Sequence, residues 1–169
     1  MRLRWCAVGI LFVSGTMASV GQLIAADDVP FEVLGLLMKT EAGADDTNGS
    51  MSVVRVDTPP GSGPPAHIHR LDDELFVVLE GQYRFWIEGK PAVDAGPGDV
   101  IFMPRGVAHQ YLNTGDKAGR HFFVTVPGGL DELFAEIHSG ELAMPKDKEV
   151  IFQLSEKYGI EYVPPLITK

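Results

Sequence analysis

This chain of 169 residues has little cysteine and little positive charge. Its single cysteine, Cys6, excludes an internal disulfide and a metal site built from several thiolates. The chain has 14 Lys and Arg against 23 Asp and Glu, which gives a formal net charge of −9. Because an acidic surface repels phosphate backbones and anionic headgroups, nucleic-acid binding and membrane-surface binding are disfavoured.

The sequence has only one long apolar run, which lies near its start. Two arginines precede an apolar stretch over residues 5–18, and Ala25 and Ala26 stand before two aspartates. This order of basic, apolar and small residues predicts a signal peptide over residues 1–26, and therefore an exported protein, periplasmic or secreted. A retained membrane anchor is the alternative. Glycine and serine interrupt the run, which favours cleavage; cleavage would also remove Cys6 and leave no membrane segment.

Glycine and proline are abundant, with 19 and 12 residues, and they divide the chain into short segments. Runs of strand length lie between these turn residues, at 31–38, 51–57, 75–79, 82–87, 100–103, 110–112 and 122–126. Short strands separated by Gly and Pro turns favour a β-sandwich or a small barrel. The chain is long enough for one domain with its own core, and we expect this barrel at residues 27–128.

The hydrophobic period changes after residue 128. Apolar residues then recur at the spacing of one helix face, at Leu130, Leu133, Phe134 and Ile137. A second helix is expected to start near Asp147 and to stop at Gly159. We therefore expect residues 129–169 to form a helical extension that packs on the barrel.

Three histidines stand in two short segments that are rich in Gly and Pro. His67 and His69 are two residues apart in an extended stretch, so their imidazoles point to the same side of a sheet. Glu74 opens the next strand and His109 opens a later one, so both can reach the same cavity. Imidazoles and a carboxylate that converge in this way suit a first-row divalent metal ion. A lone His-x-His pair is more often a surface pair, and the acidic run at 72–74 alone is typical of a solvated turn, so the prediction depends on both segments together.

Together the two segments resemble the two signature motifs of the cupin superfamily. The first motif is matched by Gly61, His67, His69, Glu74 and Gly81, and the second by Gly98, Pro104, Gly106, His109 and Asn113. More weakly, residues 64–69, 78–81 and 158–161 are similar to small quercetin-dioxygenase-like cupins. The resemblance implies an all-β double-stranded β-helix, or jelly roll, with a metal near the centre of the barrel held by His67, His69, Glu74 and His109. Asn113 is expected to support the strand after His109 rather than to touch the metal.

The resemblance also implies an activity. A quercetinase-like cupin is a metal-dependent dioxygenase that acts on a small hydroxylated organic substrate, and Glu74 would serve as ligand and as general base. Three nitrogens and one carboxylate suit Fe, Mn, Co, Ni, Cu or Zn, while the lack of thiolates disfavours a closed structural zinc site. Two alternatives stay open: an exported protein that binds a metal or small ligand without turnover, and an isomerase or epimerase on the same barrel.

Other residues carry weaker expectations. His121 could line the pocket, although a place in the core or on the surface is more common, and His138 is interpreted as a charge partner at a helix end. Arg105 is expected to be exposed in its turn. For four aromatic residues both pocket and core stay open: Phe76, Phe102, Tyr111 and Phe123.

A homodimer is predicted from an apolar segment near the start of the barrel. This segment contains Phe31, Val33, Leu34, Leu36 and Leu37. Because an exposed apolar edge on a small barrel favours association, we expect a second copy of the chain to cover it.

Overall fold

The computed structural model describes residues 30–166, so the expected signal peptide lies outside the described residues. These residues form eleven strands and two helices in this order: β1 Phe31–Val33, β2 Leu36–Ala42, β3 Ser52–Thr58, β4 His67–His69, β5 Asp73–Glu80, β6 Tyr83–Ile87, β7 Val93–Ala95, β8 Val100–Met103, β9 His109–Asn113, β10 Gly119–Val126, α1 Leu130–Ser139, α2 Lys148–Lys157 and β11 Ile160–Tyr162. No helix in this described part is long and apolar enough to cross a membrane.

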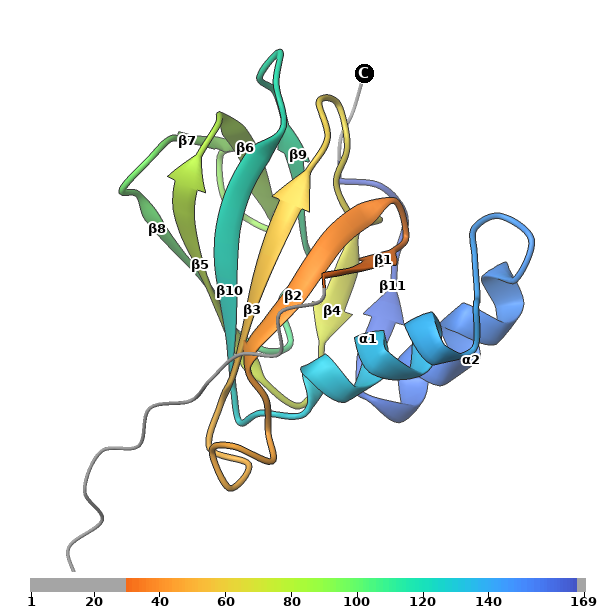
Figure 1. Cartoon of the computed structure of the whole chain (residues 1–169). Helices are drawn as coiled ribbons and strands as arrows, with labels where there is room; N and C mark the ends of the chain where they lie inside the picture. The colour runs from red at the N-terminus through yellow and green to blue at the C-terminus, as the bar shows by residue number, and fades with distance from the viewer. Residues whose placement is uncertain (1–29, 167–169) are drawn as a thin grey trace, which may run out of the picture.

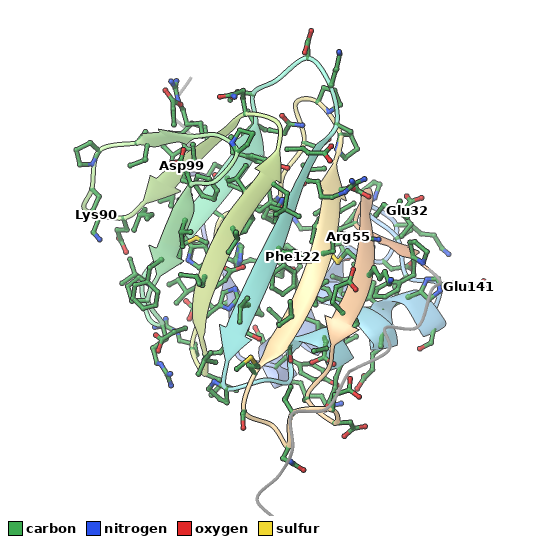
Figure 2. The ribbon with its side chains drawn as sticks, turned by 60° about the vertical axis from the view of Figure 1, so that its left-hand side comes forward. Glu32, Arg55, Lys90, Asp99, Phe122 and Glu141 are labelled. Carbon is green, nitrogen blue, oxygen red and sulfur yellow. The ribbon has the colours of Figure 1, made fainter. Side chains whose placement is uncertain are left out.

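Two antiparallel sheets face each other and enclose the core (Figure 1). One sheet has the strand order β1-β2-β3-β10-β5-β8, and the other has the order β11-β4-β9-β6-β7. Alternate side chains point into the space between them: Val54 and Val56 of β3 are buried, whereas Arg55 between them lies on the outer face with Phe122 of β10 (Figure 2). The predicted all-β jelly roll is confirmed.

The apolar stretch at 31–38 forms two strands rather than one. Leu34 and Gly35 adopt positive φ angles of 54° and 78°, and this tight turn folds β1 back on β2. Val33 and Leu36 are buried in the core of the same chain, and among the apolar residues of this segment only Leu37 is exposed, at 43%. The homodimer stays a prediction, but its proposed surface is largely covered within the chain itself.

The C-terminal extension closes one side of the barrel. α1 packs on β1 and β3, and α2 packs on β11, so both helices lie beside the barrel as expected (Figure 1). The strand β11 was not predicted. It pairs antiparallel with β4, placing Tyr162 opposite His67 and Ile160 opposite His69. The extension is therefore part of the second sheet as well as a helical layer.

Candidate metal centre

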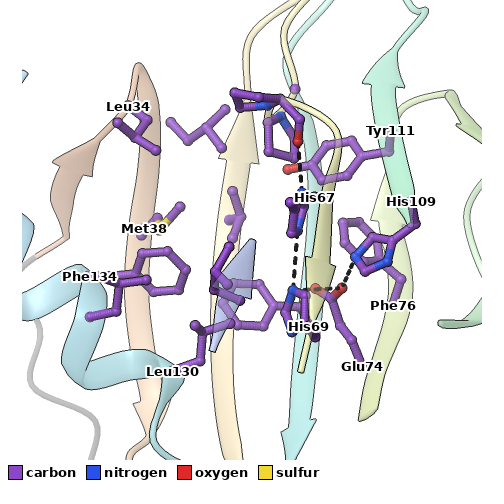
Figure 3. Close-up of a pocket in the computed structure, with 18 of the residues that line it drawn as sticks. Leu34, Met38, His67, His69, Glu74, Phe76, His109, Tyr111, Leu130 and Phe134 are labelled. Carbon is purple, nitrogen blue, oxygen red and sulfur yellow. Dashed lines mark hydrogen bonds and ion pairs between the residues drawn. The ribbon is translucent and has the colours of Figure 1, made fainter. Parts of the chain in front are cut away.

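The four residues that the motifs indicate converge between the two sheets. His67 and His69 lie on β4, and His67 is the register partner of His109, the first residue of β9. Glu74 comes from the opposite sheet, at the second position of β5. One donor atom from each of the four residues lies within 4.8 Å of the others. Figure 3 shows the carboxylate of Glu74 directed at the imidazoles.

Backbone carbonyls orient two of the three imidazoles. Nδ1 of His67 lies 2.7 Å from the carbonyl oxygen of Pro65, and Nδ1 of His109 lies 3.0 Å from that of Val107. A carbonyl oxygen only accepts hydrogen bonds, so both Nδ1 atoms carry the proton. The lone pair of each neutral ring is then on Nε2, which faces the centre of the cluster.

A buried carboxylate orients the third imidazole. Nδ1 of His69 lies 2.6 Å from Oδ2 of Asp72, and both residues are buried. Asp72 belongs to the acidic run that alone is typical of a solvated turn, so sequence reasoning missed its role. A histidine followed three residues later by an acid is a weak signal for such a partner, because exposed pairs share this spacing.

The inner face of the cluster has lone pairs but lacks protons. Nε2 of His67 and Nε2 of His69 are 3.1 Å apart, and Nε2 of His109 lies 3.2 Å from Oε2 of Glu74. Among the described residues, the buried Nε2 of His109 has no hydrogen-bond partner. Three nitrogen lone pairs and a carboxylate repel one another unless a positive charge lies between them. The donor set therefore fits one divalent transition metal ion.

The pKa shifts of the clustered side chains also indicate that the site favours a positive charge. Burial raises the pKa of Glu74, but the neighbouring imidazoles of His69 and His109 outweigh it and lower the pKa to about 2. Burial and the neighbouring imidazoles lower the pKa of His67 to about 3. Burial likewise disfavours a charge on His69, yet Glu74 and Asp72 together raise its pKa. The two carboxylates, Glu74 and Asp72, therefore favour a positive charge at this site.

Replacing Asp72 by alanine is expected to weaken metal binding about 10–100-fold, the usual cost of losing the partner that orients a ligating imidazole. Isothermal calorimetry with Zn²⁺ measures the effect. Asp73→Ala is the matched control, because the Asp73 carboxylate binds Arg105 rather than a histidine. Equal affinities for the two variants would contradict the assigned role of Asp72.

A cavity of about 90 Å³ lies beside the cluster. Its walls are mostly apolar and come from β2, β3, β5, β10, α1 and β11, with Met38, Phe76, Phe123, Leu130, Phe134 and Tyr162 among the lining residues. In Figure 3, Met38 and Phe134 lie on the side of the cavity opposite His67 and His109. A metal in the cluster would thus face a mostly apolar space.

The other predicted residues fall into different places. Asn113, the last residue of β9, was expected to support the strand after His109; its side-chain amide donates to the carbonyl oxygens of Thr58 and Lys117, at 2.8 and 2.9 Å, and takes no part in the cluster. Phe102 is 55% exposed on the outer face of β8, so its placement in pocket or core is wrong. By contrast, Phe76, Tyr111 and Phe123 are buried and also line the cavity.

Arg105 and His138 lie where they were predicted, in a turn and at a helix end. Arg105 is exposed, and its guanidinium is also held by the carboxylate of Asp73 at 2.8 Å. His138 lies in the last turn of α1, where a positive charge is favourable, and its ring contacts Phe31 with centroids 5.2 Å apart. Neither residue takes part in the cluster of four.

His121 lies in the core behind the cavity wall. It is fully buried, its ring stacks on Phe76 at a centroid distance of 4.0 Å, and Nδ1 lies 3.2 Å from the hydroxyl of Tyr83. Nε2 has no hydrogen-bond partner among the described residues. Burial lowers the pKa of His121 from 6.5 to about 3, because a charged imidazole is poorly solvated there.

His121 is therefore expected to destabilise the fold in acid. Its folded pKa lies below the unfolded value, so the stability it confers is complete above pH 6.5 and falls towards pH 3. The slope is about 1.4 kcal/mol per pH unit. Urea unfolding between pH 7 and pH 4 should show that the free energy of unfolding falls less steeply for His121→Phe than for the wild type. His138→Phe, at an exposed position, should keep the wild-type slope; parallel profiles for all three proteins would contradict the assignment.

Comparison with known proteins places this geometry in a family. Residues 54–127 match the cupin domain. Quercetin 2,3-dioxygenase of Bacillus subtilis is 32% identical over 102 residues, which are 58% of this chain and 28% of that enzyme, so the chain spans little more than a quarter of its length. Protein SchB of Streptomyces halstedii is 33% identical over 108 residues, covering 60% of this chain and 75% of SchB.

A solved structure agrees with these sequence relatives. The crystal structure of a predicted oxalate decarboxylase from Thermotoga maritima is 28% identical, with a TM-score of 0.51 over 54% of this chain and 80% of that chain. The matching domain, the two facing sheets and the buried cluster of histidines and glutamate lead to one conclusion: the chain belongs to the cupin superfamily.

Proposed function

We propose that this protein is a metal-dependent dioxygenase acting on a small hydroxylated organic substrate. His67, His69, Glu74 and His109 would hold one divalent transition metal ion, and Fe, Mn, Co, Ni, Cu and Zn all suit this donor set. The observation that carries the proposal is the set of inward-facing lone pairs beside an apolar cavity. When bound, the metal would act as a Lewis acid that holds the substrate oxygen and lowers the pKa of its hydroxyl.

Glu74 is proposed as the group that takes the hydroxyl proton. Its carboxylate is ionised at neutral pH, and Oε2 would accept the proton of a bound hydroxyl whose own pKa a metal ion lowers. Oε2 lies 3.2 Å from Nε2 of His109 and 3.7 Å from Nε2 of His69, at the inner face of the cluster. A substrate oxygen that enters the cluster therefore comes within reach of this carboxylate.

The apolar walls are proposed to exclude water and to orient the substrate. Phe76 and Phe123 are buried in the wall, and Leu130 and Phe134 bring α1 over the cavity. A reactive intermediate in such a space is protected from hydrolysis. The similarity to a quercetin 2,3-dioxygenase supports oxygen chemistry on a hydroxylated compound, and the pattern of residues 1–26 supports export as part of the proposal.

Oxygen uptake by metal-loaded protein tests the proposed function. A panel of enediol-like compounds and hydroxyketones should include one that consumes oxygen in proportion to product formed. Glu74→Gln should lose this uptake because an amide cannot accept the proton. A protein that binds such compounds without uptake would be a binding protein, and one that converts them without oxygen would be an isomerase; either result would overturn the proposal.

A further inference from the structure

The far side of the cavity is built by segments that lie outside the matching cupin domain. The match ends at residue 127, whereas Leu130, Phe134 and Tyr162 of the lining come after it. Leu34 and Met38 come before the match begins at residue 54. The candidate metal ligands all lie within the match. Part of the wall that faces a bound molecule is therefore built by segments outside the family match, whereas the candidate metal ligands lie inside it.

The lining provides no charge other than that of the cluster. Of the described residues that line the cavity, none is Lys, Arg or Asp, and the only carboxylate is that of Glu74. Two tyrosines, Tyr111 and Tyr162, add hydroxyl groups. A second carboxylate or a phosphate on the substrate would be buried without a cation to pair with it, which costs free energy. The part of the substrate that extends away from the metal must therefore be uncharged and mainly apolar.

The volume of the cavity limits the size of that part. It measures about 90 Å³. An apolar protein cavity of about 150 Å³ accommodates one benzene molecule, and pockets for drug-sized ligands measure about 300–1,000 Å³. A three-ring flavonol is therefore too large for the cavity as it stands. The cavity is also smaller than one that encloses a benzene ring, so the largest body compatible with these walls is a short chain, or a single ring that enters only in part and is held at the metal by its oxygens.

Phe134 is the residue best placed to set this limit. It lies on α1, opposite the histidines in Figure 3, and it is only half-buried, so its ring contributes to the wall more than to the core. One buried ring, Phe123, holds it at a centroid distance of 5.6 Å in an edge-to-face contact. Truncation of Phe134 would enlarge the cavity from the side that faces the metal cluster.

We infer that this cavity selects an uncharged substrate of no more than about one ring, whose oxygens lie at the metal cluster, and that Phe134 determines the size limit. The inference rests on the proposed function in placing the substrate oxygens at the cluster. It narrows the substrate class from hydroxylated compounds in general to small hydroxyketones, enediols or catechols without a charged substituent.

Binding without oxygen tests the inference. The probes are 3-hydroxy-2-methyl-4-pyrone and 3-hydroxyflavone, which share one hydroxyketone group and differ in apolar bulk, with a carboxylated 3-hydroxy-4-pyrone as the charged probe. Calorimetry uses the Zn²⁺-loaded full chain under nitrogen, so that no turnover occurs. The methylpyrone should bind at least about tenfold more tightly than either of the other two probes.

Variants at Phe134 test whether this residue sets the size limit of the cavity. Phe134→Ala should reduce the preference for the pyrone over the flavone about tenfold, and Phe134→Leu should give an intermediate value in case the alanine variant does not fold. Phe102→Ala removes an exposed ring from the outer face of β8 and should leave the preference unchanged. Equal binding of the two probes by the wild type, or an unchanged preference in a folded Phe134 variant, would overturn the inference.

The outcomes separate this inference from the proposed function. If the size preference is found but no compound consumes oxygen, the dioxygenase proposal fails and the selectivity of the cavity stands. If the flavone supports oxygen uptake and the pyrone does not, the size limit fails and the dioxygenase proposal stands.

Discussion

His109→Ala is expected to abolish stoichiometric metal binding. The substitution removes the Nε2 donor of a 2% exposed imidazole and leaves Glu74, His67 and His69 around an incomplete cluster. The loss of affinity should exceed the roughly 10–100-fold that the loss of a hydrogen-bond partner outside the cluster costs. No other imidazole is near enough to replace it, because His121 lies in the core behind Phe76. Elemental analysis after dialysis against metal-free buffer measures the metal content per chain.

The matched control for this experiment is His138→Ala. His138 is an exposed histidine at the end of α1, and its removal should leave the metal content at the wild-type level. Circular dichroism of both variants checks that each is folded. Full occupancy in His109→Ala together with metal loss in His138→Ala would show that the cluster assigned here is wrong.

Gly63→Ala should cause the largest loss of stability among simple substitutions near the site. Gly63 passes so close to β9 that an added Cβ would lie 2.0 Å from the carbonyl oxygen of Tyr111 and 3.0 Å from its carbonyl carbon. The segment around Gly63 and β9 cannot move apart easily, because the backbone N–H of Asn113 donates to the carbonyl oxygen of Ser62 at 2.9 Å. We expect a loss of about 3 kcal/mol in the free energy of unfolding, or failure to fold.

Gly61→Ala provides the comparison, since Gly61 belongs to the motif but stands in open space. Its positive φ of 69° makes a side chain unfavourable, yet a Cβ there meets no atom within 4 Å. The expected loss is about 1 kcal/mol, the usual cost of alanine in a left-handed conformation. Urea unfolding measures both variants. Equal losses, or a larger loss for Gly61→Ala, would show that the contact between Gly63 and β9 is not the limiting one.

The sequence predicts the cluster well because two simple regularities act there. The two-residue period of an extended chain places His67 and His69 on one side, and the motif spacing brings Glu74 and His109 to the same cavity. The same reasoning misses Asp72, because a local run of acids does not reveal which one folds inward. Contacts between elements that are far apart in the sequence decide which acid is buried, and periodicity gives no information about such contacts.

The wrong or missing predictions about the fold also have local causes. Val100–Met103 is apolar at every position, so alternation cannot tell the inner residues from the outer ones, and Phe102 points outward. β7 and β11 have three residues each, too few to show a period. The helices were predicted correctly because each has ten residues, which is enough turns for the spacing of the buried residues to reveal the helical period.

The pairing of β11 with β4 has a consequence for how the protein reaches its native state. β4 carries two of the four clustered residues, and without β11 it would be an edge strand with unpaired backbone groups. Synthesis proceeds from the N-terminus, so residues 160–162 emerge well after every other strand. Until then, an unprotected edge next to the histidines is available to pair with other chains. Thus β11, the last strand of the described residues, completes the sheet and also covers an edge that would be available for aggregation.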